Sequence, residues 1–195
     1  MRWNSLFDDL EAQFSAERAL ASESEIAERA KVELAGIEVG DRLRGAVGAA
    51  IKVLLVDGIV LRGELGHVGS EWLVLTEGAR QWLIPLASVI SYQGLGRLSL
   101  KPLTRTRQSL GIASALRALS RDRAELVIHL TVRTGDGHKL RGVIDRVGRD
   151  YFDLAAVLNG EARRVGNVAE VVTVPFGSIA AICSDGGLGL QGGGY

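Results

Sequence analysis

The side chains of this sequence best suited to chemistry are cations gathered in residues 97–123. This stretch sets seven basic side chains against one carboxylate, Asp122; the seven are Arg97, Lys101, Arg105, Arg107, Arg117, Arg121 and Arg123. Cations at this density can neutralise several phosphates and give salt-sensitive nucleic-acid binding. They can equally pair with residues 1–41, which hold ten carboxylates and four basic side chains. Both interpretations stay open.

Two further arginines, Arg62 and Arg141, each stand immediately before a glycine in two similar segments. Guanidinium groups at equivalent places could grip phosphate or carboxylate. The alternative is a solvent-facing strand position where arginine serves solubility. Four aromatic side chains also have two interpretations. They could stack on nucleic-acid bases, or they could pack within or between folded units. They are Trp72, Trp82, Tyr151 and Phe152.

Residue types used in catalysis are present but not in catalytic spacing. His67, His129 and His138 form no HExxH or HxH ligand pattern, and the single cysteine, Cys183, supplies no metal-binding pair. No G-x-S-x-G context surrounds a serine, and the glycine-rich end lacks the Gly-Lys-Ser/Thr of a phosphate loop. The sequence therefore predicts no enzyme, no metal, no cofactor and no small-molecule substrate.

The segments that carry many of these residues occur as two similar copies in the sequence. Residues 57–75 match residues 136–154 at a constant offset of 79, and residues 85–89 match residues 175–179 at an offset of 90. The second copy therefore carries an insertion between its third and fourth strands. Such a repeat predicts two copies of one small β unit.

Each copy is expected to form a short helix followed by five strands. In the first copy Asp41 caps a helix through about Val47, Asp57-Gly58 makes a hairpin turn, and Pro85 ends the fourth strand. The expected strands are residues 51–55, 59–68, 71–75, 81–85 and 89–92. In the second copy a helix over about 109–121 precedes strands that resume near Ile128 and close near Ile182.

Repeated glycines are predicted to be structural. Gly63 and Gly142 lie mid-strand, where a missing Cβ permits the sharp bend that closes a small barrel. The full set is Gly58, Gly63, Gly69, Gly137, Gly142 and Gly148. Because small barrels leave open edges, the two copies are expected to cover each other's edge as a pseudo-twofold pair.

The motif V-x-L-x-D-G-x-x-L-x-G-x-L-x-x-V-G, then an aromatic and a leucine, then I-P-L-x-x-V, resembles the Sm/LSm RNA-binding barrels. The resemblance covers residues 41–92 and 112–183 and implies two tandem Sm/SH3-like five-stranded barrels. Where Sm proteins carry a base-binding Asp and Asn, this chain has Gly69 and Leu73. The whole chain also resembles actinobacterial proteins opening M-R-W-x-x-L-F-x-D-L-E-A-Q, which are often labelled Fis-type transcriptional regulators.

An apolar stripe marks the N-terminal segment, with Trp3, Leu6, Phe7, Leu10 and Phe14 at three- and four-residue intervals. This spacing predicts an amphipathic helix. The stripe either packs on the chain's own barrels or docks into a second subunit or another protein. Its acidic polar face does not suit an anionic membrane surface.

The sequence thus predicts a mainly β protein with α-helices, in five parts. These are a helical arm (1–40), a first barrel (41–92), a basic connector (93–111), a second barrel (112–183) and a disordered glycine-rich tail (184–195). One cysteine, no apolar run of about 18 residues and no signal-peptide order predict a cytoplasmic location. The expected function is a non-catalytic regulator contacting RNA, DNA or a nucleoprotein complex. The alternative is a protein–protein adaptor or oligomerising scaffold that uses the N-terminal helix.

Overall fold

The computed structural model describes Glu25, Glu28, Arg29 and residues 31–101, 110–132, 139–156 and 170–184. The chain divides into two compact units, Met1–Glu38 and Val39–Tyr195. In the first unit the described residues up to 35 are helical, with ion pairs Arg29–Glu25 at 2.6 Å and Lys31–Glu28 at 2.9 Å. The predicted apolar stripe, residues 3–14, lies outside the described residues.

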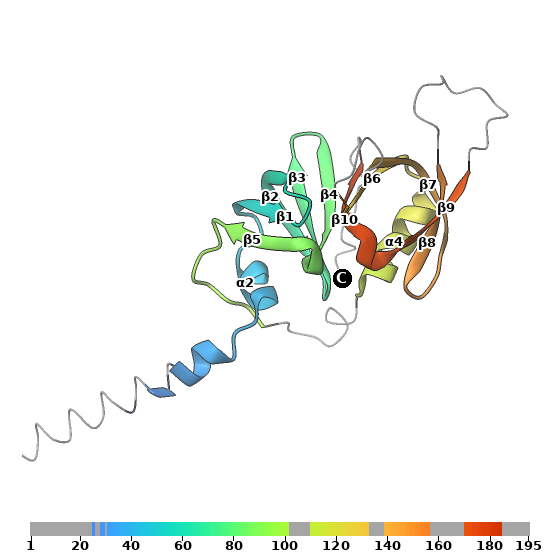
Figure 1. The fold of residues 1–195 in the computed structure, drawn as a ribbon. Helices are drawn as coiled ribbons and strands as arrows, with labels where there is room; N and C mark the ends of the chain where they lie inside the picture. The colour runs from blue at the N-terminus through green and yellow to red at the C-terminus, as the bar shows by residue number, and fades with distance from the viewer. Residues whose placement is uncertain are drawn as a thin grey trace, which may run out of the picture. The chain divides into compact units, whose positions relative to one another are not determined.

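The described residues of the second unit are mainly β, as predicted, and form helices at two places (Figure 1). The helices are α2 (Val39–Gly45) and α4 (Ile112–Asp122), with short 3-10 turns η1 (Leu86–Ser88) and η3 (Phe176–Ser178). The first five strands are β1 (Ala50–Leu55), β2 (Val60–Val68), β3 (Trp72–Glu77), β4 (Arg80–Pro85) and β5 (Val89–Gln93). The next five are β6 (Leu126–Leu130), β7 (Lys139–Val147), β8 (Tyr151–Ala156), β9 (Val171–Pro175) and β10 (Ile179–Ser184).

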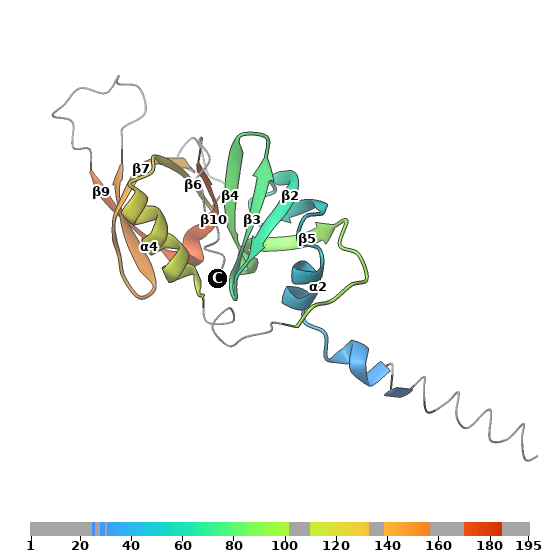
Figure 2. The same ribbon diagram turned by 180° about the vertical axis from the view of Figure 1, so that it is seen from behind.

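These ten strands form one antiparallel sheet in the order β5-β1-β2-β3-β4-β10-β6-β7-β8-β9. In each half the fifth strand returns to pair with the first, as in Tyr92–Val53 and Ile182–Ile128. Figures 1 and 2 both show β4 and β10 side by side where the halves meet. Ser184, expected in the tail, is the last residue of β10.

The two halves repeat the same backbone hydrogen bonds. Gly69 N–H donates to the Trp72 carbonyl as Gly148 N–H does to Tyr151, both at 2.8 Å. Leu86 N–H likewise donates to Glu71, and Phe176 N–H to Asp150, again at 2.8 Å. The sequence repeat is therefore a structural repeat.

The way the copies meet differs from the predicted pseudo-twofold pair. A twofold would join like strands, whereas here the fourth strand of the first half, β4, pairs with the fifth strand of the second half, β10. The copies therefore cover one edge each in a head-to-tail joint, and all ten strands belong to one continuous sheet. The repeat fixes which strands exist, but edge pairing depends on contacts between residues about 100 positions apart.

The described residues of this unit form two hydrophobic cores, and each core includes side chains from both halves. The first gathers around Leu55, Leu65 and Leu75 and includes Ala181 and Cys183 of β10. The second gathers around Leu116, Ile128 and Phe152 and includes Trp72 and Leu83 of β3 and β4. The joint is thus part of both cores.

The repeated glycines allow close approaches. A Cβ on Gly63 would overlap the Thr76 carbonyl of β3, and one on Gly142 would overlap the Ala155 carbonyl of β8. Gly69 and Gly148 instead make room for the rings of Trp72 and Tyr151. Gly58 turns the β1–β2 hairpin with φ 83°, and Gly137 lies outside the described residues.

Both helices start at places other than those predicted. α2 begins at Val39, so Asp41 lies inside its first turn, buried and 2.6 Å from Arg44, and is not the cap. α4 begins at Ile112, with Gly111 at its N-cap, and lies against β7 (Figure 2). Both helices make contacts with segments distant in sequence, which their own residues do not reveal.

Candidate nucleic-acid interface

The predicted basic stretch does not form one surface. Residues 95–100 run along α2, where the Leu100 N–H donates to the Asp41 carbonyl at 2.9 Å and Arg42 donates to the Gly96 carbonyl at 2.9 Å. This places Arg97 and Lys101 with the first half. Arg117 and Arg121 belong to α4, Arg123 is the C-cap of that helix, and all three lie in the second half. Arg105 and Arg107 lie outside the described residues.

The described cations of the predicted site are exposed, and six of them have no ion pair. No carboxylate of the described residues lies within 4.0 Å of Arg62, Arg97, Lys101, Arg117, Arg121 or Arg123. Arg44 and Arg146, by contrast, face Asp41 and Asp153 at 2.6 and 3.9 Å. The six charges are therefore available to an external anion.

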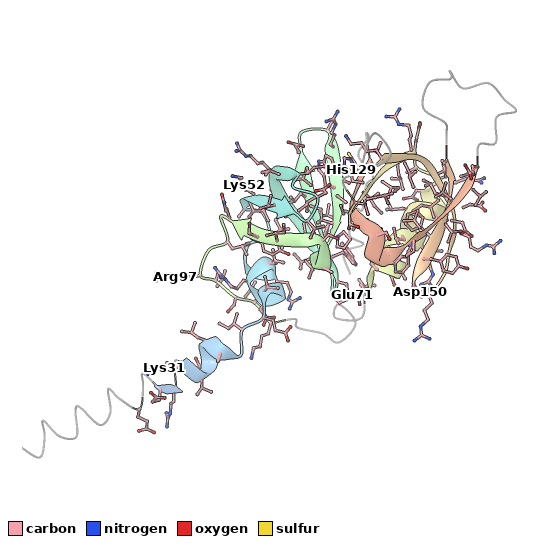
Figure 3. The ribbon with its side chains drawn as sticks, viewed as in Figure 1. Lys31, Lys52, Glu71, Arg97, His129 and Asp150 are labelled. Carbon is pink, nitrogen blue, oxygen red and sulfur yellow. The ribbon has the colours of Figure 1, made fainter. Side chains whose placement is uncertain are left out.

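Lys52 and Arg62 stand directly opposite each other in the β1–β2 register. Side chains in such pairs project from the same face, and like charges there destabilise the sheet. Glu64, two residues along β2, forms no ion pair with either of them within the described residues. Figure 3 shows Lys52 and Arg97 both on the first half. In the second half Arg141 is exposed opposite Val127, so the like-charge pair occurs in one copy.

The arginines of α4 donate hydrogen bonds to backbone carbonyls, and their side chains remain exposed. Arg117 donates to the Gly148 carbonyl at 3.2 Å, and Arg121 donates to the Arg117 carbonyl at 3.4 Å. Ser120 fixes the helix on β7 by donating to the Ile144 carbonyl at 3.3 Å. Arg123 follows in the left-handed conformation, with φ 48°.

Side chains of the first half position the start of α4. Gly111 offers no capping side chain, and the Glu71 carboxylate instead accepts from Ile112 N–H at 3.2 Å. The Trp72 indole donates to the Leu110 carbonyl at 2.9 Å. Ser88 adds a buried hydrogen bond to the Ile179 carbonyl at 2.5 Å. These contacts lock the joint beside the β4–β10 pairing.

Three of the four candidate stacking aromatics are buried, which corrects the base-stacking interpretation for them. Trp72 and Trp82 are 8% and 7% exposed and Phe152 is fully buried. Trp82 packs edge-on against His129 of the second half, with ring centroids 5.2 Å apart. Tyr151 is half-buried over Gly148. These rings therefore serve the cores and the joint.

An apolar pocket of about 220 Å³, which sequence reasoning missed, lies between α4 and the joint. Its walls include Trp72 and Leu83 from the first half and Leu119, Leu126 and Ile182 from the second. Because the lining comes from both copies, no local sequence pattern marks it.

The remaining chemical residues are structural in position. Burial lowers the pKa of His129, nearby Lys139 lowers it further, and Asp57 opposes them. Burial also raises the pKa of Tyr92 to about 12. Cys183 is buried. Within the described ranges no three His, Cys, Asp or Glu side chains gather as metal ligands.

Among the described residues no helix has the length and apolarity needed to cross a membrane. No family model matches the chain. Two curated relatives are similar over short segments. One, the potassium-binding subunit of a potassium-transporting ATPase from Kineococcus radiotolerans, is 46% identical over 56 residues, 29% of this chain and 10% of that protein. The same subunit from Nocardia farcinica is 44% identical over 57 residues, with the same coverage. The chain therefore spans about a tenth of the length of these relatives.

Proposed function

We propose that the protein is a non-catalytic regulatory binding protein that contacts nucleic acid or a nucleoprotein complex. Its two halves are tandem small barrels of the Sm/SH3-like type. In support, each half runs helix then five strands, with the fifth strand paired to the first around its own core. In this arrangement the barrels are scaffolds and the exposed cations are the contact.

The observation that carries the proposal is the Lys52–Arg62 pair. Two cations directly opposite on neighbouring strands, without a carboxylate partner in the described part of the chain, destabilise the free protein. A phosphate between them removes this repulsion. The arginines of α4 provide a second contact, because Arg117 and Arg121 are one helical turn apart and exposed.

Binding to RNA and duplex DNA at about 50 and about 200 mM salt tests the proposal, since phosphate contacts lose affinity steeply over that range. Fluorescence anisotropy with labelled oligonucleotides gives the dissociation constants. Lys52→Gln with Arg62→Gln, and Arg117→Gln with Arg121→Gln, should each weaken binding. Each should also lower the salt slope by about 1 for every phosphate that the variant no longer neutralises.

Arg29→Gln with Lys31→Gln is the matched control. These cations are also exposed, but each is paired with a carboxylate, so their removal should change affinity little. If no oligonucleotide binds at the lower salt, or if the control loses as much affinity as the test variants, the proposal is wrong.

A protein–protein adaptor or oligomerising scaffold is the second candidate. The apolar pocket beside α4 favours it, and so do the two outer strands of the sheet, each of which pairs with one strand among the described residues. Removing residues 1–20 and comparing captured partners tests the part assigned to the N-terminal stripe. Unchanged capture would exclude that stripe as the contact.

A further inference from the structure

The apolar pocket beside α4 is an open space of about 220 Å³ whose walls come from both halves of the unit. The nucleic-acid proposal makes no use of this space, because its lining includes none of the exposed cations. We propose that the pocket binds a small amphipathic amine, in which an aromatic ring is joined by a short chain to an ammonium group. The ligand is bound and not converted, and the proposal stands apart from nucleic-acid binding.

The floor of the pocket is the joint between the two halves. Val74 pairs with Leu83 across β3 and β4, and Leu83 pairs with Ile182 across β4 and β10. Directly opposite side chains project from the same face of a sheet, so these three form one apolar row. Trp72, two residues before Val74 on β3, lies on the same face and extends the floor at one end. An indole ring in the wall attracts both a second ring and a cation.

Small side chains on α4 leave this floor uncovered. Of the helix residues that line the pocket, Ser114, Ala115 and Ala118 are small. The helix is held to the second core by Leu116, which is fully buried. An apolar cavity of about 150 Å³ holds a benzene molecule. The space beside α4, about 220 Å³, therefore suits one aromatic ring with a short chain.

One end of the pocket is polar. Gln81 and Ser184 pair directly across the joint, so their side chains lie side by side on the face that forms the floor. Asp122, the last residue of α4, lines the same pocket. The chain leaves α4 at Asp122 and enters β6 at Leu126, which pairs with Ser184, so the carboxylate belongs to this polar end. The start of α4 lies at the opposite end, beside Trp72.

The polar groups at this end have no partners among the described residues. Within that part of the chain, the Gln81 amide, the Ser184 hydroxyl and the Asp122 carboxylate form no hydrogen bond or ion pair. Ser184 is 5% exposed and lines the pocket, so its hydroxyl opens chiefly onto this space. All three side chains can accept a hydrogen bond. A ligand whose polar end donates hydrogen bonds would therefore satisfy them.

The polar end is also negative. Asp122 places a carboxylate at the C-terminal end of a helix, where the helix dipole already favours a cation. Arg121 and Arg123 adjoin it in sequence, but neither lines the pocket, and among the described residues no cation lies within 4.0 Å of it. Glu71 is occupied at the opposite end, where it accepts from Ile112 N–H at 3.2 Å (Figure 3). Charge complementarity therefore favours an ammonium group at Asp122.

A chemical-shift titration of the full chain, without nucleic acid, tests the proposal with three compounds of similar size. They are phenethylamine, phenethyl alcohol and phenylacetate, which differ in the charge of the polar end. Trp72 lines the pocket, so its indole N–H reports binding, whereas Trp82 lies outside the lining and is the internal reference. Phenethylamine should bind with a dissociation constant below about 1 mM. It should bind about fivefold more tightly than the alcohol, and phenylacetate should bind most weakly.

Two substitutions separate the charge of the pocket from its space. Asp122→Asn removes the charge alone, so it should weaken phenethylamine about fivefold and leave the alcohol unchanged. Ala118→Leu fills the space, so it should abolish the Trp72 shifts caused by all three compounds. Glu125→Gln and Ala113→Leu are the matched controls, because they make similar changes at residues that do not line the pocket. Neither control should change binding.

Any of four results would overturn the proposal. Phenethylamine leaves Trp72 unshifted at its highest soluble concentration, which would leave the pocket to an apolar side chain of this chain or of another protein. Phenylacetate binds as tightly as phenethylamine, Asp122→Asn has no more effect than Glu125→Gln, or Ala118→Leu binds like the unaltered chain. If Ala118→Leu fails to fold, the comparison of amine with carboxylate on the unaltered chain still decides. Since no nucleic acid is present, none of these results bears on the nucleic-acid proposal.

Discussion

At the scale of single residues, Gly63 is fixed by the backbone of β3. Gly63→Ala would place a Cβ against the Thr76 carbonyl, which cannot move without breaking the sheet. We expect a loss of about 1–3 kcal/mol in the free energy of unfolding, typical of overpacking. Urea unfolding followed by circular dichroism measures it.

Gly66→Ala is the control on the same strand. A Cβ there would lie 3.8 Å from the Val74 carbonyl, an ordinary contact. Equal losses for the two variants would show that any side chain in β2 is costly and that crowding at Gly63 is not the cause.

His129 makes stability depend on pH. Burial and Lys139 lower its pKa below the ordinary 6.5, so the folded protein resists a proton that the unfolded chain accepts. The contribution of neutral His129 to the free energy of unfolding is therefore complete above pH 6.5. This contribution is lost as pH falls through the pKa of His129 in the folded protein. Leu54 is the counterpart of His129, because it pairs with Val60 as His129 pairs with Lys139. His129→Leu, which installs that residue, should reduce the decline between pH 7.5 and pH 5. The urea midpoint at both pH values checks this, and an undiminished decline would assign the effect to other groups.

At the scale of elements, α4 ends on a residue ill-suited to its conformation. Arg123 has φ 48°, which costs a non-glycine residue roughly 1 kcal/mol. Arg123→Gly should raise the melting temperature by about 2–4 °C while removing one cation of the proposed interface. Arg123→Ala removes the same charge but keeps the strain, so it should show no rise. A rise in both variants would attribute the gain to charge.

The sequence predicted most elements because their signals are local. Asp57-Gly58 places the hairpin through the positive φ of Gly58, and Pro85 ends β4 as expected. The start of α4 was misplaced because its first amide is received by Glu71, 41 residues earlier. Capping from a distant segment leaves no mark in the helix's own sequence.

The candidate site was predictable by residue type but not by arrangement. Clustered cations predict exposure, and the described ones are exposed. Their division between α2 and α4, and the pairing of Lys52 with Arg62, follow from strand register and from the path of residues 95–100. Register across the sheet is set by packing of both cores, which a linear pattern does not contain.

At the scale of the whole molecule, the joint makes the second unit cooperative. Leu83 lies in the first half but packs in the second core, and Cys183 lies in the second half but packs in the first. Neither half can unfold without exposing apolar surface of the other. Residues 39–195 should therefore unfold in one transition, despite the internal duplication.

Leu83→Ala tests this coupling. Leu83 is 8% exposed and should cost about 2–5 kcal/mol on truncation. Hydrogen exchange in β2 reports on the first half, and hydrogen exchange in β8 reports on the second. Both transitions should shift together to lower urea. Thr173→Ala, at the exposed counterpart position on β9, should cost about 0.5 kcal/mol or less. A shifted transition in β8 beside an unchanged one in β2 would show that the halves unfold separately, because only a shared core transmits the loss from one half to the other.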